Sequence, residues 1–295
     1  MSGTRRRNRP QRVPLWFGLP AAAVFLFVII VPSFQGIGLS LTDWNGITDD
    51  FDFVGFENFA RIFTDPRALG ALQNTLVLAI AVTVLQNVLG LALALGVNGR
   101  VKSRHVLRVI FFTPVVLTPL VAGYIWGYLL SPRGTVNETL DVLGLGFLAQ
   151  TWLGDPKFAL GSICVAIIWQ FAGYSMVIYL AGLQAIPAEI NEAAMLDGAG
   201  PVRRFLSVTL PLINGALVVS LLLTLIGSLS QFDQVMAMTG GGPGNATQTV
   251  STSIFRIGFA AGDYPYGIAL AVVMTVFVAG AAALQYRITS RKVTF

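Results

Sequence analysis

The chain has 295 residues, of which 55% are hydrophobic and only 11% are charged. A soluble domain carries about 25% charged residues, so this composition indicates an integral membrane protein and excludes an ordinary soluble domain. The net charge of +5 does not indicate nucleic-acid binding, because the basic residues flank apolar stretches instead of forming one patch.

Six apolar segments without Asp, Glu, Lys or Arg follow one another along the chain. Each is long enough to cross a bilayer, which takes about 20 residues, and each must satisfy its own backbone polar groups, so each is expected to be helical. The sequence therefore predicts an all-α polytopic membrane protein, with a basic tail at residues 1–13 and a transmembrane domain at residues 14–295. The expected spans are residues 14–38, 72–97, 109–130, 159–183, 209–231 and 266–286.

The positions of the basic residues predict the orientation of these spans. Both tails and the loops after the second and fourth spans hold most of the 19 lysines and arginines, whereas 11 of the 14 acidic residues lie on the other side. Because cytoplasmic loops are enriched in Lys and Arg, both termini and the loop after the fourth span are predicted to face the cytoplasm. The expected location is the plasma (inner) membrane of a bacterium.

The loop after the fourth span, about residues 186–208, is a short polar segment between two long apolar ones. Pro187 ends the preceding helix, and good helix formers follow it. Gly198 and Gly200 favour a tight exit from this short helix, and Pro201 suits the first turn of the next. The loop is either a docking element for another protein or an ordinary amphipathic segment at the membrane surface.

The order of residues in this loop resembles the coupling loop of ABC importer permeases. That family's pattern is Glu-Ala-Ala, a glycine four residues later, and then hydrophobic-x-Leu-Pro. The matching residues here are Glu192, Ala193, Ala194, Gly198, Val208, Leu210 and Pro211. The resemblance implies that a separate ATPase is contacted by Glu192, Ala193, Ala194, Asp197, Gly198, Ala199, Arg203 and Leu206.

More of the chain, about residues 15–290, is similar to sugar-type permeases, in particular to the first permease subunit of maltose and glycerol-phosphate importers. The stretches that carry this similarity are 53–59, 74–75, 111–114, 185–187 and 239–243. It implies the type I importer permease fold, a second homologous permease, two ABC ATPase subunits and an extracytoplasmic solute-binding protein. Val202 departs from the family pattern, because many relatives have an aromatic residue there.

The sequence shows no motif for binding and hydrolysing ATP. It has no G-x-x-x-x-G-K-[ST] loop, and its Gly-rich segment 240–244 has no lysine and is expected to form a flexible turn on the outer side. The lone Cys164 is expected to be a packing residue, and the lone His105 offers no partner for a metal site. The chain is therefore predicted to be a non-enzyme without a cofactor or metal, with ATP and Mg²⁺ bound by the partner ATPase.

Polar and aromatic side chains within the fourth and fifth spans are the candidates for substrate contact. An aromatic face beside hydrogen-bonding groups suits a sugar. By resemblance, Trp169, Tyr174 and residues 228–233 fall where sugar importers contact substrate. The candidate residues are Trp169, Gln170, Tyr174, Ser228, Gln231 and Asp233. The alternative is that they bond neighbouring helices, which is the role expected of Gln86 and Asn87.

The predicted function is that of the permease subunit of an ATP-driven importer for a sugar or oligosaccharide, working by alternating access. One alternative is the same machine for another solute such as glycerol phosphate. A phosphate would favour Arg or Lys along the path, and none lies in the spans. A second alternative is an ion-driven secondary transporter, which would favour intramembrane Asp, Glu or His, also missing from the spans.

Overall fold

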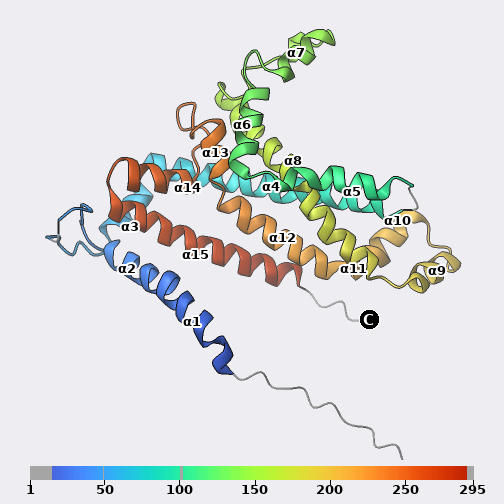
Figure 1. Ribbon diagram of the computed structural model, residues 1–295, viewed down its shortest axis with the longest axis horizontal. Helices are drawn as coiled ribbons and strands as arrows, with labels where there is room; N and C mark the ends of the chain where they lie inside the picture. The colour runs from blue at the N-terminus through green and yellow to red at the C-terminus, as the bar shows by residue number, and fades with distance from the viewer. Residues whose placement is uncertain (1–14, 49, 100–101, 291–295) are drawn as a thin grey trace, which may run out of the picture.

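The computed structural model describes residues 15–48, 50–99 and 102–290 (Figure 1). The predicted all-α class is confirmed: the regular elements of these residues are helices, beside one isolated antiparallel bridge between Thr42 and Phe53. The predicted basic tail at 1–13 lies outside the described residues. Its separation from a transmembrane domain at 14–295 stays a prediction.

Four helices are long and apolar enough to cross a membrane alone. They match the first, second, fourth and sixth predicted spans, and the last three run further than predicted because their ends include the charged residues Arg67, Lys157 and Arg287. α4 and α8 each begin at an aspartate followed by proline, and the Asp65 and Asp155 carboxylates accept the backbone N–H groups two residues on, at 2.9 and 2.8 Å. The four are Trp16–Leu39 (containing α1, Leu19–Phe25, and α2, Val31–Leu39), α4 (Pro66–Asn98), α8 (Pro156–Gln184) and α15 (Tyr264–Thr289).

The third and fifth predicted spans are bent, and the prediction of one uninterrupted helix for each was wrong. The helical stretch Arg104–Val116, which begins as α5 (Arg104–Phe112), meets α6 (Pro119–Leu129) at 98°. Leu117 and Thr118 are extended between them, because a residue before a proline avoids the helical region. Pro201–Leu212 meets α12 (Asn214–Leu229) at 71°. Six spans result when each bent pair is one span.

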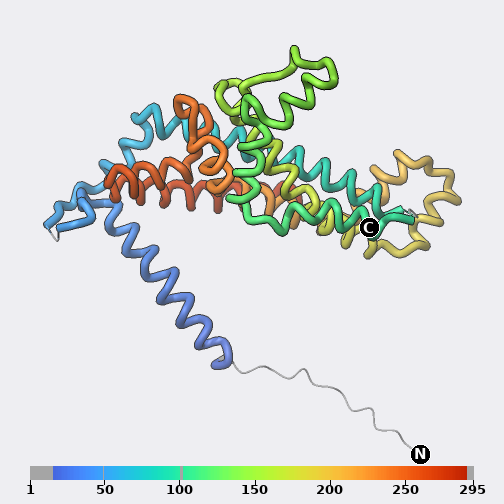
Figure 2. Tube along the Cα trace, turned by 45° about the horizontal axis from the view of Figure 1, so that its top comes forward, coloured from blue at the N-terminus to red at the C-terminus, as the bar shows by residue number. Residues whose placement is uncertain are grey.

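The helices pack into a bundle around α4 and α8, which lie side by side, with α12 against both (Figure 1). Small residues allow the backbones to approach closely: a Cβ at Gly173 in α8 would lie 2.0 Å from the Phe111 carbonyl oxygen in α5. The helix Trp16–Leu39 diverges from this bundle, and its apolar window has no buried residue (Figure 2). Its apolar surface is therefore free for lipid or another protein.

The two ends of the bundle carry different connections. α9 (Ala188–Leu196) and α10 (Pro201–Arg204) lie at one end, and α3 (Glu57–Thr64) and α14 (Val250–Ile254) lie at the other (Figure 1). α7 (Thr135–Val142) projects away from the bundle beyond α6. The predicted cytoplasmic loop thus lies at the end opposite the connections that contain α3 and α14 (Figure 1).

Candidate translocation site and coupling loop

The loop after α8 is closed by a local backbone motif. The Gly198 N–H donates to the Met195 carbonyl at 3.1 Å, and the Ala199 N–H donates to the Ala194 carbonyl at 3.0 Å. This pair is the Schellman arrangement, which needs a left-handed residue after the helix. Gly198 supplies it with a φ of +76°. A side chain there would strain the backbone without meeting a neighbour within 4 Å.

The second glycine does not have the predicted role. Gly200 has a φ of −64°, which any residue adopts, and it serves as the residue before α10. The prediction that both glycines shape the exit from α9 is therefore corrected to Gly198 alone. The connection between α9 and α10 ends at Pro201, which is the first residue of α10, as expected.

Most of the loop is exposed, and neither α9 nor α10 contains a buried residue. Leu196 is 89% exposed and Val202 is 70% exposed. Large apolar side chains that gather on a surface beside acidic ones are typical of a protein interaction site. Among the predicted coupling residues, Ala194 and Ala199 are partly buried, while the exposed ones are Glu192, Ala193, Asp197, Gly198, Arg203 and Leu206.

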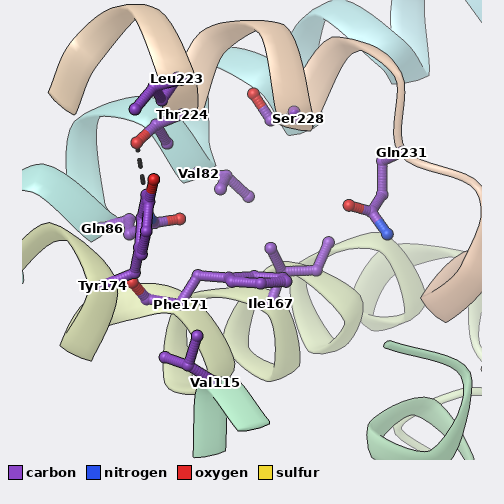
Figure 3. A pocket seen from close by; sticks show the side chains of 11 residues that line it. Val82, Gln86, Val115, Ile167, Phe171, Tyr174, Leu223, Thr224, Ser228 and Gln231 are labelled. Carbon is purple, nitrogen blue, oxygen red and sulfur yellow. Dashed lines mark hydrogen bonds between the residues drawn. The ribbon is translucent and has the colours of Figure 1, made fainter. Parts of the chain in front are cut away.

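A cavity of about 390 Å³ lies between α4, α8 and α12, with Val115 from the segment after α5 closing one side (Figure 3). Its wall is mainly apolar, with a few polar groups, as is usual for a small-molecule site. Of the predicted substrate residues, the structure brings Tyr174, Ser228 and Gln231 together at this cavity. None of the residues that line it carries a formal charge.

The other three predicted residues lie elsewhere. Trp169 packs edge-on against Trp126, with ring centroids 5.7 Å apart, on the far side of α8 from the cavity lining. Gln170 is fully buried and donates to the Leu117 carbonyl at 2.9 Å. Asp233 is exposed in the first turn of α13 (Asp233–Met238).

The cavity lining also includes residues outside the predicted substrate set, among them Gln86, Phe171 and Thr224. Residues 167, 171 and 174 are spaced by four and three, so a helical face shared with Tyr174 was the available signal. Gln86 was expected to join helices, and it does so by donating to Ser175 Oγ at 2.9 Å. It borders the cavity as well.

The expected role of Asn87 as a link between helices is confirmed. Its side-chain oxygen accepts from the Tyr179 hydroxyl of α8 at 2.8 Å and from the Ser220 hydroxyl of α12 at 2.6 Å, and its nitrogen donates to the Thr83 carbonyl at 2.7 Å. Asn87 is 6% exposed, so these bonds satisfy a buried amide between three helices. Cys164 is buried in the apolar core, the position expected of a packing residue.

The Gly-rich segment 240–244 forms the predicted turn, but side chains hold it in place. The fully buried Thr247 donates to the Gly242 carbonyl at 2.7 Å, and Asn74 of α4 donates to the Gln248 carbonyl at 3.0 Å. Gly240 and Gly241 have left-handed φ values. The turn is therefore tied to α4. Across residues 15–48, 50–99 and 102–290, no group of three or more His, Cys, Asp or Glu side chains is placed to bind a metal ion.

A bundle of bent and straight apolar helices, a mainly apolar cavity between them and an exposed loop at one end of the bundle are the features of the membrane-spanning subunit of a transport system. Residues 86–294 match the family described as binding-protein-dependent transport system inner membrane component, and the chain belongs to this family. It is a multi-pass, non-catalytic permease subunit of an ABC transporter, in which a partner ATPase hydrolyses ATP.

Individual relatives match over nearly their whole length. A probable ABC transporter permease of Bacillus subtilis is 32% identical, over 95% of this chain and 97% of that protein. The diacetylchitobiose uptake system permease of Streptomyces coelicolor is 33% identical, over 95% of this chain and 86% of that protein. A bacterial ABC transporter involved in the import of the acidic polysaccharide alginate has the same fold, with a TM-score of 0.81, 24% identity and 95% coverage of both chains.

Proposed function

We propose that this chain forms part of the translocation path of an ATP-driven importer for a sugar or oligosaccharide. The observation that carries the proposal is the cavity: an uncharged site lined by the rings of Phe171 and Tyr174, with the Gln86 amide near Tyr174 and the Gln231 amide across the cavity (Figure 3). Aromatic faces pack on the C–H surface of a sugar, and amide and hydroxyl groups bond its hydroxyls. The Streptomyces coelicolor relative, named for diacetylchitobiose uptake, supports the same substrate class.

The connection between the loop and the cavity supports coupling through the Glu192 helix. α8, which carries Ile167, Phe171 and Tyr174, leads directly into the loop, and the helical segment after the loop leads into α12, which carries Thr224 and Ser228. Both walls of the cavity are thus joined to α9. A displacement of α9 by an ATPase acts on both walls at once, and this would open the cavity to alternate sides of the membrane.

The remaining partners are part of the proposal. We expect a second homologous permease, two ABC ATPase subunits that bind ATP and Mg²⁺, and an extracytoplasmic solute-binding protein. The unburied apolar helix Trp16–Leu39 supports a further helical partner or lipid. Both termini and the Glu192 loop face the cytoplasm of a bacterial cell in this proposal, as the distribution of basic residues indicates.

The test is uptake of radiolabelled maltose, trehalose and cellobiose by the host, with and without an in-frame deletion of this chain. Loss of uptake of at least one sugar, restored by a plasmid copy, supports the proposal. A second deletion removes the ATPase. Uptake that persists without the ATPase and collapses with a proton ionophore would instead indicate the ion-driven alternative. Loss of glycerol phosphate uptake alone would indicate the non-sugar alternative.

A further inference from the structure

A chain of buried side-chain amides runs from the break before α6 to the cavity. The Leu117 carbonyl accepts from Gln170 Nε2 at 2.9 Å, and Gln170 Oε1 accepts from Gln234 Nε2 at 2.8 Å. Gln234 Oε1 then accepts from Nε2 of Gln231, which borders the cavity. Gln170 and Gln234 are fully buried, so water does not compete for these bonds.

The start of this chain sets the direction of every amide in it. A backbone carbonyl only accepts, so Gln170 must present its NH₂ group to Leu117 and its oxygen to Gln234. Gln234 must then offer its own oxygen to Gln231. One N–H of Gln231 is used in this way, and the Gln231 side-chain oxygen is turned toward the cavity (Figure 3).

The remaining polar groups of the cavity also have their donors engaged. Gln86 Nε2 donates to Ser175 Oγ at 2.9 Å and to Thr224 Oγ1 at 3.4 Å, and within the described residues its oxygen has no partner. The Thr224 hydroxyl donates to the Ser220 carbonyl at 2.8 Å, and the Ser228 hydroxyl donates to the Leu225 carbonyl at 3.2 Å. What these groups leave for a ligand is lone pairs.

Tyr174 is the exception. It is 40% exposed, and within the described residues its hydroxyl has no hydrogen-bond partner, so it can donate or accept. The lining of the cavity includes no Lys, Arg or His among the described residues. The site therefore offers several acceptors and few free donors, namely the Tyr174 hydroxyl and the second N–H of the Gln231 amide.

We propose that this cavity selects neutral, hydroxyl-rich saccharides over their carboxylate, phosphate and sulfate counterparts, with Gln231 as a specificity-determining contact and Gln170 and Gln234 as positioning residues. This inference rests on the proposed function of the cavity as a sugar site. Sugar hydroxyls donate hydrogen bonds to the free side-chain oxygens of the cavity lining. An anionic group carries only acceptors, so it meets mostly lone pairs, with few donors and no compensating positive charge, and it loses its hydration.

The test has two stages. The first is the uptake experiment above, which identifies at least one neutral disaccharide that needs this chain. The second is equilibrium binding of that labelled disaccharide, and of its uronate in which one terminal CH₂OH is oxidised to COO⁻, to the purified complex in nanodiscs without the solute-binding protein. We expect the neutral sugar to bind at least about tenfold more tightly, because a buried polar group that is left without its partner is costly.

Variants then distinguish the direct contact of Gln231 with the sugar from the positioning of Gln231 by Gln234. Gln231→Arg places donors and a positive charge in the cavity and should reverse the preference toward the uronate. The matched control is Gln73→Arg, the same change on an exposed residue of α4 outside the cavity, which should leave the ratio unchanged. Gln234→Met frees the Gln231 amide to rotate and should reduce the ratio toward one. Co-purification of the ATPase verifies that each variant is assembled.

The outcomes are distinguishable. If the deletion leaves uptake of all three sugars intact, the proposed function fails and the inference fails with it. If the deletion abolishes uptake but the complex binds sugar and uronate equally, the proposed function stands and the inference is overturned. A Gln231→Arg complex that assembles and keeps the wild-type ratio also overturns it. A preference that reverses in Gln231→Arg and weakens in Gln234→Met supports it.

Discussion

The α9–α10 loop and the interior between α4, α8 and α12 are held in shape by different means. The loop has no buried residue, and its turn is fixed by backbone hydrogen bonds between residues at most five apart. The interior is fixed by side chains far apart in sequence, such as Asn87 with Tyr179 and Ser220. The loop thus keeps a defined shape without burial, so its surface remains available to a partner, whereas the interior ties the cavity walls together.

This contrast implies that substitutions in the loop change function with little effect on stability, whereas substitutions in the interior change stability first. The largest effect is expected for Gly198→Val. A β-branched residue at φ +76° is strained by about 1–3 kcal/mol and should displace the end of α9. We expect uptake to fall to the level of the deletion strain, while the complex still assembles in the membrane.

The matched control for that prediction is Gly200→Ala. Gly200 has an ordinary φ of −64°, and a Cβ there meets nothing within 4 Å. Uptake and ATPase co-purification are measured for both variants. Normal uptake by Gly198→Val, or an equal loss in Gly200→Ala, would contradict the assignment of the turn to Gly198.

Gly173→Ala is the corresponding test of the interior. The added Cβ would lie 2.0 Å from the Phe111 carbonyl oxygen, which is part of the α5 backbone and cannot move aside alone. We expect a loss of about 1–3 kcal/mol in the free energy of unfolding, measured by thermal melting of the purified protein. Gly161→Ala in the same helix has open space and should melt like the wild type. Equal melting of the two variants would show that α5 and α8 are not in close contact.

Asn87→Ala should have a smaller effect on stability. It removes the oxygen that accepts from Tyr179 and Ser220 and leaves two buried hydroxyls without that partner. Side-chain hydrogen bonds between membrane helices are worth about 0.6 kcal/mol on average and up to about 1.7 kcal/mol, so a loss in this range is expected. Asn191→Ala in α9 is the comparison in the loop and should leave the melting temperature unchanged. An equal loss of stability in both variants would contradict the proposed difference between the loop and the interior.

Tyr174→Phe should have the smallest effect. It removes the free hydroxyl from the cavity and retains the aromatic ring, so one exposed hydrogen bond to the sugar is lost, worth about 0.5–1.5 kcal/mol. The apparent KM for uptake should rise severalfold, with an unchanged melting temperature. An unchanged KM would place the substrate away from this ring.

The sequence predicted those parts of the molecule that local rules determine. Apolar length locates the spans, and the glycine after α9 marks the turn, because these features depend on neighbouring residues alone. The breaks near Leu117 and Ile213 were missed, although Pro114, Pro119 and Pro211 lie beside them. A proline permits a bend, but packing against neighbouring helices decides whether it occurs.

The candidate site shows the same limit. Polar residues within spans were recognised as a class, but periodicity could not separate Gln231, which borders the cavity, from Gln170, which is buried among protein partners. That distinction depends on pairings of Gln170 in α8 with Leu117 before α6 and with Gln234 in α13. Gln86 was predicted to join helices. It also lines the cavity, and this second role arises because α12 packs opposite α4.

The central claim is that movement of α9 changes access to the cavity. The direct measurement is labelling of a Ser228→Cys variant, in a Cys164→Ala background, by a membrane-impermeant thiol reagent added from outside. The account predicts that a non-hydrolysable ATP analogue increases labelling in the assembled complex and that adding Gly198→Val abolishes this increase. Labelling that is unchanged by the ATP analogue, or that increases equally with and without Gly198→Val, would contradict the account.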